Sequence, residues 1–232
     1  FQIDSSIYVL EMEWIDGFDL LHILRRETLD IVHDAVSETR FASINRRVIT
    51  TGEVDCRLKP GMAVAILREC LIGIAALHRG GIVHCDLKPS NVMVKRTGQV
   101  KIIDFGSAYW IGRPPAAQPC TLEYAAPEIL AGQRATPQSD LASLGYMLIE
   151  MLSGSRPFAG MHFDQLLQAK LNILERLPAL LPLEEFQFSE SLILLLRGLL
   201  HPDPRQRFTT AEDAELSETG ASGFLRELVK SD

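Results

Sequence analysis

One stretch, residues 84–106, limits most strongly what this chain can fold into. It reads HCDLKPSN, then VMVKRTGQVKII, then DFG. Two short runs of β-forming residues, 92–95 and 100–103, flank a Thr97-Gly98 turn. This pattern predicts a β-hairpin with a polar loop at each open end, so that the two loops lie near one another.

The two loops carry the side chains that phosphoryl transfer needs. Asp86, Lys88 and Asn91 lie in the first loop and Asp104 lies in the second. A carboxylate can orient a hydroxyl group, oxygen ligands can bind Mg²⁺, and a cation can neutralise charge that develops on phosphate. In an ordinary surface hairpin such residues would only serve turns. The ordered set H-x-D-x-K-x-x-N followed by DFG is far more specific than DFG alone.

The stretch resembles the catalytic and metal-binding loops of the protein kinase family in its Ser/Thr-directed form. The resemblance implies an α+β, protein-kinase-like fold, with a mainly helical C-terminal lobe and a small catalytic β-hairpin. Asp86 would orient the substrate hydroxyl and accept its proton, and Lys88 would neutralise the transferring phosphoryl group. Asn91 and Asp104 would hold the Mg²⁺ ions that bridge the phosphates of the cofactor ATP.

The same resemblance divides the chain into two parts. Residues 1–17 would hold the last strand or strands of the small lobe with the hinge, and 18–232 would form the C-terminal lobe. The strand is expected at 7–15, with Met12 as gatekeeper. Glu13 and Ile15 would be hinge positions that bind the adenine, although an edge strand without this role would give the same pattern.

The family's Gly-rich loop, V-A-I-K lysine and αC glutamate do not occur in this sequence. We therefore expect these residues alone to be nearly inert, because nothing in them would cover the phosphates. Residues 30–60 depart from the family in another way, since roughly thirty extra residues separate two helices, a length uncommon for a passive loop. They are either a docking or regulatory insertion or a mobile, solvated excursion.

Apolar residues at helical spacing predict the rest of the lobe. Helices are expected at 18–29, 61–80, 137–153, 163–177 and 188–200, the last two separated by a break at 178–182, with a final helix and polar tail at 211–232. The helix at 61–80 leads to the catalytic loop. Prolines make 107–128 an irregular loop.

A second group of motifs extends the resemblance to the substrate side. Thr121 to Glu128 resembles the substrate-facing loop and APE element of protein kinases, which small-molecule kinases with a similar constellation lack. Asp140, in a D-x-x-S-x-G pattern, would accept backbone N–H groups of the catalytic loop. Arg207, in HPDPRQRFT, would pair with Glu128. Without these roles, Asp140 would merely favour a helix N-terminus and Arg207 would be solvated.

Cys85 is the most informative departure from the family. Many relatives carry Arg beside the catalytic Asp, where it binds a phosphate on the activation loop, and a neutral cysteine cannot do so. Between Ser107 and Thr121, Tyr109 is the only residue with a hydroxyl group. We expect activity that does not require activation-loop phosphorylation.

Composition limits the remaining possibilities. The net charge of −7 argues against nucleic acid or an anionic membrane as the main partner. No apolar run is expected to span a membrane, and the four cysteines show no metal-binding or disulfide pattern, so a cytoplasmic location is the simplest interpretation. The leading prediction is an ATP- and Mg²⁺-dependent Ser/Thr protein kinase acting on a protein. The alternatives are a pseudokinase scaffold and a small-molecule kinase.

Overall fold

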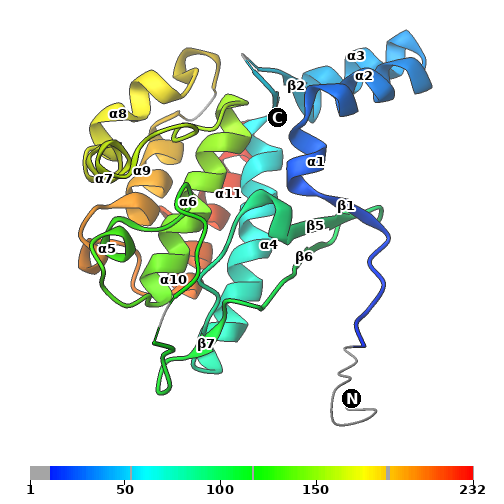
Figure 1. The fold of residues 1–232 in the computed structure, drawn as a ribbon. Helices are drawn as coiled ribbons and strands as arrows, with labels where there is room; N and C mark the ends of the chain where they lie inside the picture. The colour runs from blue at the N-terminus through cyan, green and yellow to red at the C-terminus, as the bar shows by residue number, and fades with distance from the viewer. Residues whose placement is uncertain (1–10, 53, 117, 187–188, 232) are drawn as a thin grey trace.

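The structure is a computed structural model that describes residues 11–52, 54–116, 118–186 and 189–231. Most of these residues lie in helices, and the strands are few and short. Figure 1 shows two long helices, α4 (Pro60–Arg79) and α6 (Pro137–Ser153), side by side at the centre. The predicted mixture of many helices with a small hairpin is confirmed.

Helices α4 and α6 form where helical periodicity predicted them. Pro60 occupies the first turn of α4, where its missing N–H costs nothing, and the helix ends at Gly80. Thr136 and Ser139 form a capping box at the start of α6, and Gly154 ends it with a left-handed φ of 69°. Residues 139–152 of α6 are all buried, so α6 is the centre of the core.

Helix α4 is long and apolar enough to cross a membrane by length and composition alone, contrary to the expectation above. In this structure it packs against α6, α10 (Ala211–Leu216) and α11 (Ala221–Ser231). Its inner face is buried there and includes Val64, Leu67, Leu71 and Ile74. A core helix satisfies the same criterion as a membrane span, and this packing explains its apolar composition.

The β-hairpin predicted at 92–103 is confirmed. Strands β5 (Val92–Lys95) and β6 (Val100–Ile102) pair antiparallel with Val92 opposite Ile102. Gly98 makes the turn with a φ of 88°, a conformation that residues with a side chain rarely adopt. The ladder continues beyond the strands, because the Ile103 N–H donates to the Asn91 carbonyl at 2.9 Å.

The strand predicted at 7–15 is wrong where it can be compared. Residues 7–10 lie outside the described part of the chain, and 11–16 have no regular structure. The strand instead begins two residues after the predicted end, as β1 (Gly17–Asp19), which pairs with β5. A strand needs a partner, and the pairing with β5 extends only as far as Gly17. At Gly17 the two strands lie so close that a Cβ would be 2.2 Å from the Val94 carbonyl oxygen. Strand β1 extends across the predicted boundary between residues 17 and 18. The division of the chain into the end of a small lobe and a C-terminal lobe stays a prediction.

The helix predicted at 18–29 is two helices. Asp19 caps α1 (Leu20–Leu24) by accepting the His22 N–H at 2.7 Å. Arg25 then adopts an extended backbone, and α2 (Arg26–Ala35) begins in a new direction. A change of backbone at one residue leaves the apolar spacing intact, so periodicity alone does not locate it.

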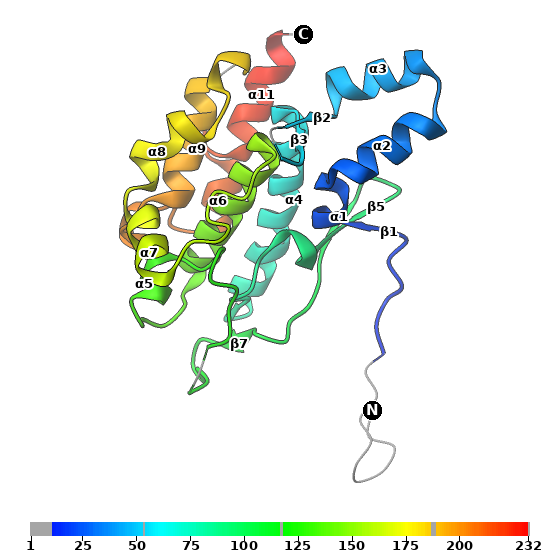
Figure 2. The same cartoon turned by 45° about the horizontal axis from the view of Figure 1, so that its top comes forward.

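The described part of 30–60, which leaves out residue 53, folds into elements of its own and is not an irregular excursion. Helix α2 and helix α3 (Glu38–Arg47) form a helical hairpin that projects from the body (Figure 2). Strands β2 (Ile49–Thr51) and β3 (Cys56–Leu58) then form a β-hairpin. The Asp55 N–H donates to the Gly154 carbonyl at 2.9 Å, which ties this hairpin to the end of α6. A docking role for the segment stays a prediction.

Two of the three helices predicted in the C-terminal part are each divided into two shorter helices. The helix expected at 163–177 is α7 (Phe163–Leu171) followed by α8 (Ile173–Leu180), which continues through Pro178 instead of breaking there. Helix α9 (Ser189–Leu200) matches the prediction, and 211–231 is α10 and α11 rather than one helix and a tail.

The remaining short elements are β4 (Ile82–Val83), β7 (Tyr109–Trp110), α5 (Pro127–Leu130) and the 3₁₀ turns 89–91, 183–185 and 204–206.

Candidate active site

The loop that carries Asp86 is fixed by a carboxylate from the central helix. Asp140, at the start of α6, is 1% exposed and accepts the backbone N–H groups of His84 and Cys85, each at 2.9 Å. The ring of His78, on α4, lies 2.9 Å from the same carboxylate. Cys85 is held at a φ of 70°, a conformation in which a β-carbon is strained. These bonds set the position of Asp86, the next residue.

Asp86 lies at the centre of a network of donors. Its Oδ2 accepts the Lys88 ammonium at 2.7 Å, and its Oδ1 accepts the Thr121 N–H at 2.9 Å and the Thr121 hydroxyl at 2.7 Å. Lys88 also donates to the Thr121 hydroxyl oxygen at 3.0 Å. Burial raises the pKa of Asp86, but the hydrogen bonds from Lys88 and Thr121 outweigh it and hold the pKa below its ordinary value. Asp86 is therefore an oriented, ionised carboxylate at neutral pH.

Asn91 and Asp104 lie at the same end of the hairpin. The register places Asn91 opposite Ile103, the residue before Asp104. Asn91 is 4% exposed and its amide donates to the Asp86 carbonyl at 2.9 Å. Asp104 is exposed, with a φ of 62°, and its Oδ1 accepts the Gly106 N–H at 3.1 Å. The structure thus joins Asp86, Lys88 and Asn91 by direct bonds and brings Asp104 to their end of the hairpin by strand pairing.

The donor set fits magnesium. The Asn91 amide oxygen and the second Asp104 oxygen are left for a hard cation, since the other atom of each group is already bonded. Mg²⁺ commonly takes one or two protein oxygens and completes its octahedron with phosphate and water. No group of three His, Cys, Asp or Glu side chains suited to a metal occurs in the described residues. A Mg²⁺ ion bound mainly by phosphate and water does not require such a group.

The predicted hinge residues lie apart from this network. Glu13 contacts the hairpin strands, with its carboxylate 3.2 Å from Lys101 and 3.5 Å from Lys95. The hydrogen bond from Lys101 holds the pKa of Glu13 below its ordinary value. Ile15 follows in a segment without regular structure. Adenine binding at Glu13 and Ile15 would use their backbone groups and stays a prediction.

Glu128 and Arg207 form a buried ion pair between α5 and the 3₁₀ turn before Arg207. Two nitrogens of Arg207 donate to the two Glu128 oxygens at 2.7 and 2.8 Å, and the pair is almost fully buried. Ser139 donates to Glu128 at 2.8 Å. Burial raises the pKa of Glu128, but the bonds from Arg207 lower it further, so that it lies below its ordinary value. This pair fixes the end of the loop at 121–126, which the family resemblance predicts to face the substrate.

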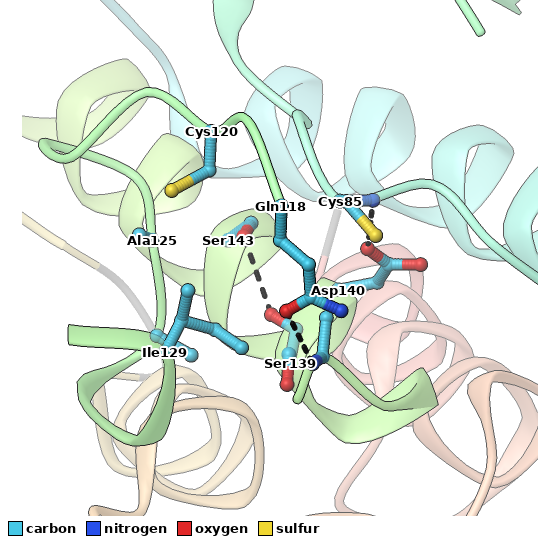
Figure 3. A pocket seen from close by; sticks show the side chains of 10 residues that line it. Cys85, Gln118, Cys120, Ala125, Ile129, Ser139, Asp140 and Ser143 are labelled. Carbon is cyan, nitrogen blue, oxygen red and sulfur yellow. Dashed lines mark hydrogen bonds between the residues drawn. The ribbon is translucent and has the colours of Figure 1, made fainter. Parts of the chain in front are cut away.

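A small cavity lies behind the loop that carries Asp86, between Asp140 and the loop after β7 (Figure 3). Its volume of about 10 Å³ suits a single water molecule. Cys85, Gln118 and Cys120 line it. Burial raises the pKa of the Cys85 thiol to about 12, so this side chain is neutral and weakly nucleophilic.

Sequence reasoning missed two buried charged residues that lie beside the loop at 121–126. Glu150 lies in the buried stripe of α6 and accepts the Tyr124 hydroxyl at 2.5 Å. Lys170 lies on the buried face of α7. The signal that could have found them is a charge at an inward position of an otherwise apolar helix face. His78, interpreted as a packed core side chain, is packed but also contacts Asp140.

Glu150 gives a testable pH dependence. Burial raises its pKa from 4.5 to about 7. Because the folded state then holds a proton that the unfolded state releases, the free energy of unfolding falls as pH rises between these values, by at most about 1.4 kcal/mol per pH unit. Glu150→Gln keeps an acceptor for Tyr124. We expect the variant to match the wild type in urea unfolding near pH 5 and to exceed it near pH 8; equal differences at both pH values would contradict this.

The sequence model of one protein family, the protein kinase domain, matches residues 5–216 of this chain. The chain is 34% identical over 169 residues to "Striated muscle preferentially expressed protein kinase" of Danio rerio, which covers 68% of this chain and 6% of the relative. It is 32% identical over 165 residues to "Serine/threonine-protein kinases drp72" of Corynebacterium efficiens, covering 69% and 31%. With "Serine/threonine-protein kinase PknA" of Mycobacterium tuberculosis the identity is 38% over 137 residues, covering 57% and 30%. The chain thus spans about a third or less of the length of these relatives.

Proposed function

This chain belongs to the protein kinase family, with the expected α+β kinase fold, and we propose on that basis that it transfers the γ-phosphate of ATP to a Ser or Thr hydroxyl of a protein. The observation that carries the proposal is the carboxylate of Asp86, held by Lys88 and Thr121 at hydrogen-bond distance. A structural scaffold would not need an ionised acid whose carboxylate accepts hydrogen bonds from Lys88 and Asn91.

In this proposal each of the four residues has its own role in the reaction. Asp86 accepts a hydrogen bond from the substrate hydroxyl and takes its proton as the new oxygen–phosphorus bond forms and the bond to ADP breaks. Lys88 stabilises the negative charge on the transferring phosphoryl group. Asn91 and Asp104 would hold Mg²⁺, which supplies charge neutralisation on the phosphates when bound. A cytoplasmic location and a docking partner for residues 30–60 stay predictions.

The direct test uses the full-length protein and ATP radiolabelled at the γ-phosphate. We expect label in phosphoserine or phosphothreonine of a generic basic protein, and none in sugars or aminoglycosides. ATP binding without transfer to any acceptor would leave the pseudokinase alternative, and label confined to a small molecule would replace the proposal with the small-molecule alternative.

Activity should also survive removal of phosphate from the activation loop. Neutral Cys85 stands where an arginine would bind such a phosphate, and Tyr109 donates its hydroxyl to the Ala135 carbonyl and is 8% exposed. We expect phosphatase-treated and untreated full-length protein to phosphorylate a peptide at the same rate. Loss of activity on phosphatase treatment, restored by incubation with ATP, would contradict this prediction.

A further inference from the structure

Lys170 is a buried lysine for which the proposed chemistry has no role. It lies on α7 with 0% of its surface exposed and is among the largest fully buried side chains in the described part of the protein. Lysine is almost never fully buried unless its nitrogen has partners, because removing it from water is costly. Its contacts therefore indicate what the residue does.

The Lys170 nitrogen bonds to the substrate-facing loop. It donates to the Glu123 carbonyl at 2.8 Å and to the Ala125 carbonyl at 2.6 Å. It also lies 4.0 Å from the centre of the Tyr146 ring and 4.6 Å from that of Phe158. These two rings meet edge to face, so the nitrogen is held against an aromatic corner. The side chain cannot move without breaking both bonds to the loop.

The carbonyl between those two is bonded as well. The Ser143 hydroxyl, on α6, donates to the Tyr124 carbonyl at 2.9 Å. Three successive carbonyls of an irregular loop are thus fixed from two different helices. Two residues before this point, Thr121 donates to the Asp86 carboxylate. A shift of the loop at Glu123 would therefore also act on Thr121 and on its contact with the Asp86 carboxylate.

Burial lowers the pKa of Lys170 well below its ordinary value. The hold on the loop does not depend on this charge. An ammonium has three N–H donors and a neutral amine has two, and two are enough for the Glu123 and Ala125 carbonyls.

We propose that Lys170 is a positioning residue for the protein substrate: its bonds to Glu123 and Ala125 fix the loop against which the substrate lies beside Asp86. Its kinetic consequence rests on the proposed function. Lys170 touches neither the nucleotide side of the hairpin nor Asp86, so its removal acts on the use of peptide and not on the binding of ATP.

Lys170→Met tests this in the full-length protein, because methionine keeps the unbranched stem and removes the donors. We expect KM for a peptide substrate to rise about tenfold or more, with kcat within about threefold and the ATP dissociation constant within about twofold of the wild type. Lys230→Met, an exposed lysine on α11, is the matched control and should change none of these. An unchanged peptide KM, or a parallel loss of ATP binding, would overturn the proposal.

A second measurement does not depend on turnover. Amide hydrogen exchange at 121–126 should become at least about tenfold faster in Lys170→Met, while exchange in α4 and α9 is unchanged. If the wild type transfers no phosphate, the proposed function fails, and this measurement still decides the role of Lys170. If the methionine variant does not fold, Lys170→Gln, whose nitrogen ends one bond short, takes its place under the same criteria. Exchange at 121–126 equal to the wild type would overturn the positioning role.

Discussion

Asp86→Asn lowers the rate of phosphoryl transfer by the full-length protein by about 10²–10⁴-fold, the usual contribution of a positioned general base. The amide cannot take the proton of the substrate hydroxyl. Its NH₂ group would also face donors, because both Asp86 oxygens accept hydrogen bonds in this structure. ATP binding should change little, since Asn91 and Asp104 carry the assigned metal contacts. Initial rates with saturating peptide, beside ATP titration, give both quantities.

The matched control for this variant is Asp16→Asn. Asp16 is an exposed carboxylate paired with Arg96 at 3.0 Å. Arg96 lies at the turn of the hairpin, which is the end opposite Asn91 and Asp104. It should retain the wild-type rate. A full rate for Asp86→Asn would remove Asp86 from the reaction, and equal losses for both variants would mean that the change is not specific to the site.

Arg207→Met should destabilise the fold by about 3–5 kcal/mol, because it leaves the Glu128 carboxylate buried without its cation. Arg207 also donates to the Gln138 and His201 carbonyls, which lose their partner in the same variant. Urea unfolding of wild type and variant measures the difference. The expected effect is large because few charged side chains among the described residues are so completely enclosed.

Two further variants show whether the buried pair is the cause. Arg205→Met removes an exposed arginine two residues away, paired with Asp203, and should leave the unfolding midpoint almost unchanged. Removing both partners, in Glu128→Gln with Arg207→Met, should cost less than Arg207→Met alone, because no charge is left unpaired. A double variant less stable than the single variant would contradict this explanation.

The parts of the fold that could be predicted are those fixed by local sequence. The hairpin around Gly98 and the long helices α4 and α6 follow from turn chemistry and from apolar spacing. The strand expected at 7–15 failed because pairing is not local: β1 forms only where β5 can reach it. The folded insertion, with α3, β2 and β3, was also beyond local reasoning, since its β-hairpin is tied by Asp55 to Gly154, about a hundred residues away in the sequence.

The candidate site shows the same division. Asp86, Lys88 and Asn91 are close in sequence, so their proximity followed from one motif, and Asp104 followed from the hairpin. The contacts of Asp140 and Arg207 were foreseen only through family resemblance. Lys170 and its loop are 47 residues apart at Glu123, and no pattern in the sequence links them. A charge on the apolar face of α7 was the one available sign.

The most direct measurement is the structure of the full-length protein with Mg²⁺ and a non-hydrolysable ATP analogue. The account predicts that Asn91 and Asp104 contact the metal at the phosphates and that the Asp86 carboxylate faces the γ-phosphate from the other side. A complex in which Asp86 and Asp104 face apart, too distant to share one nucleotide, would contradict it.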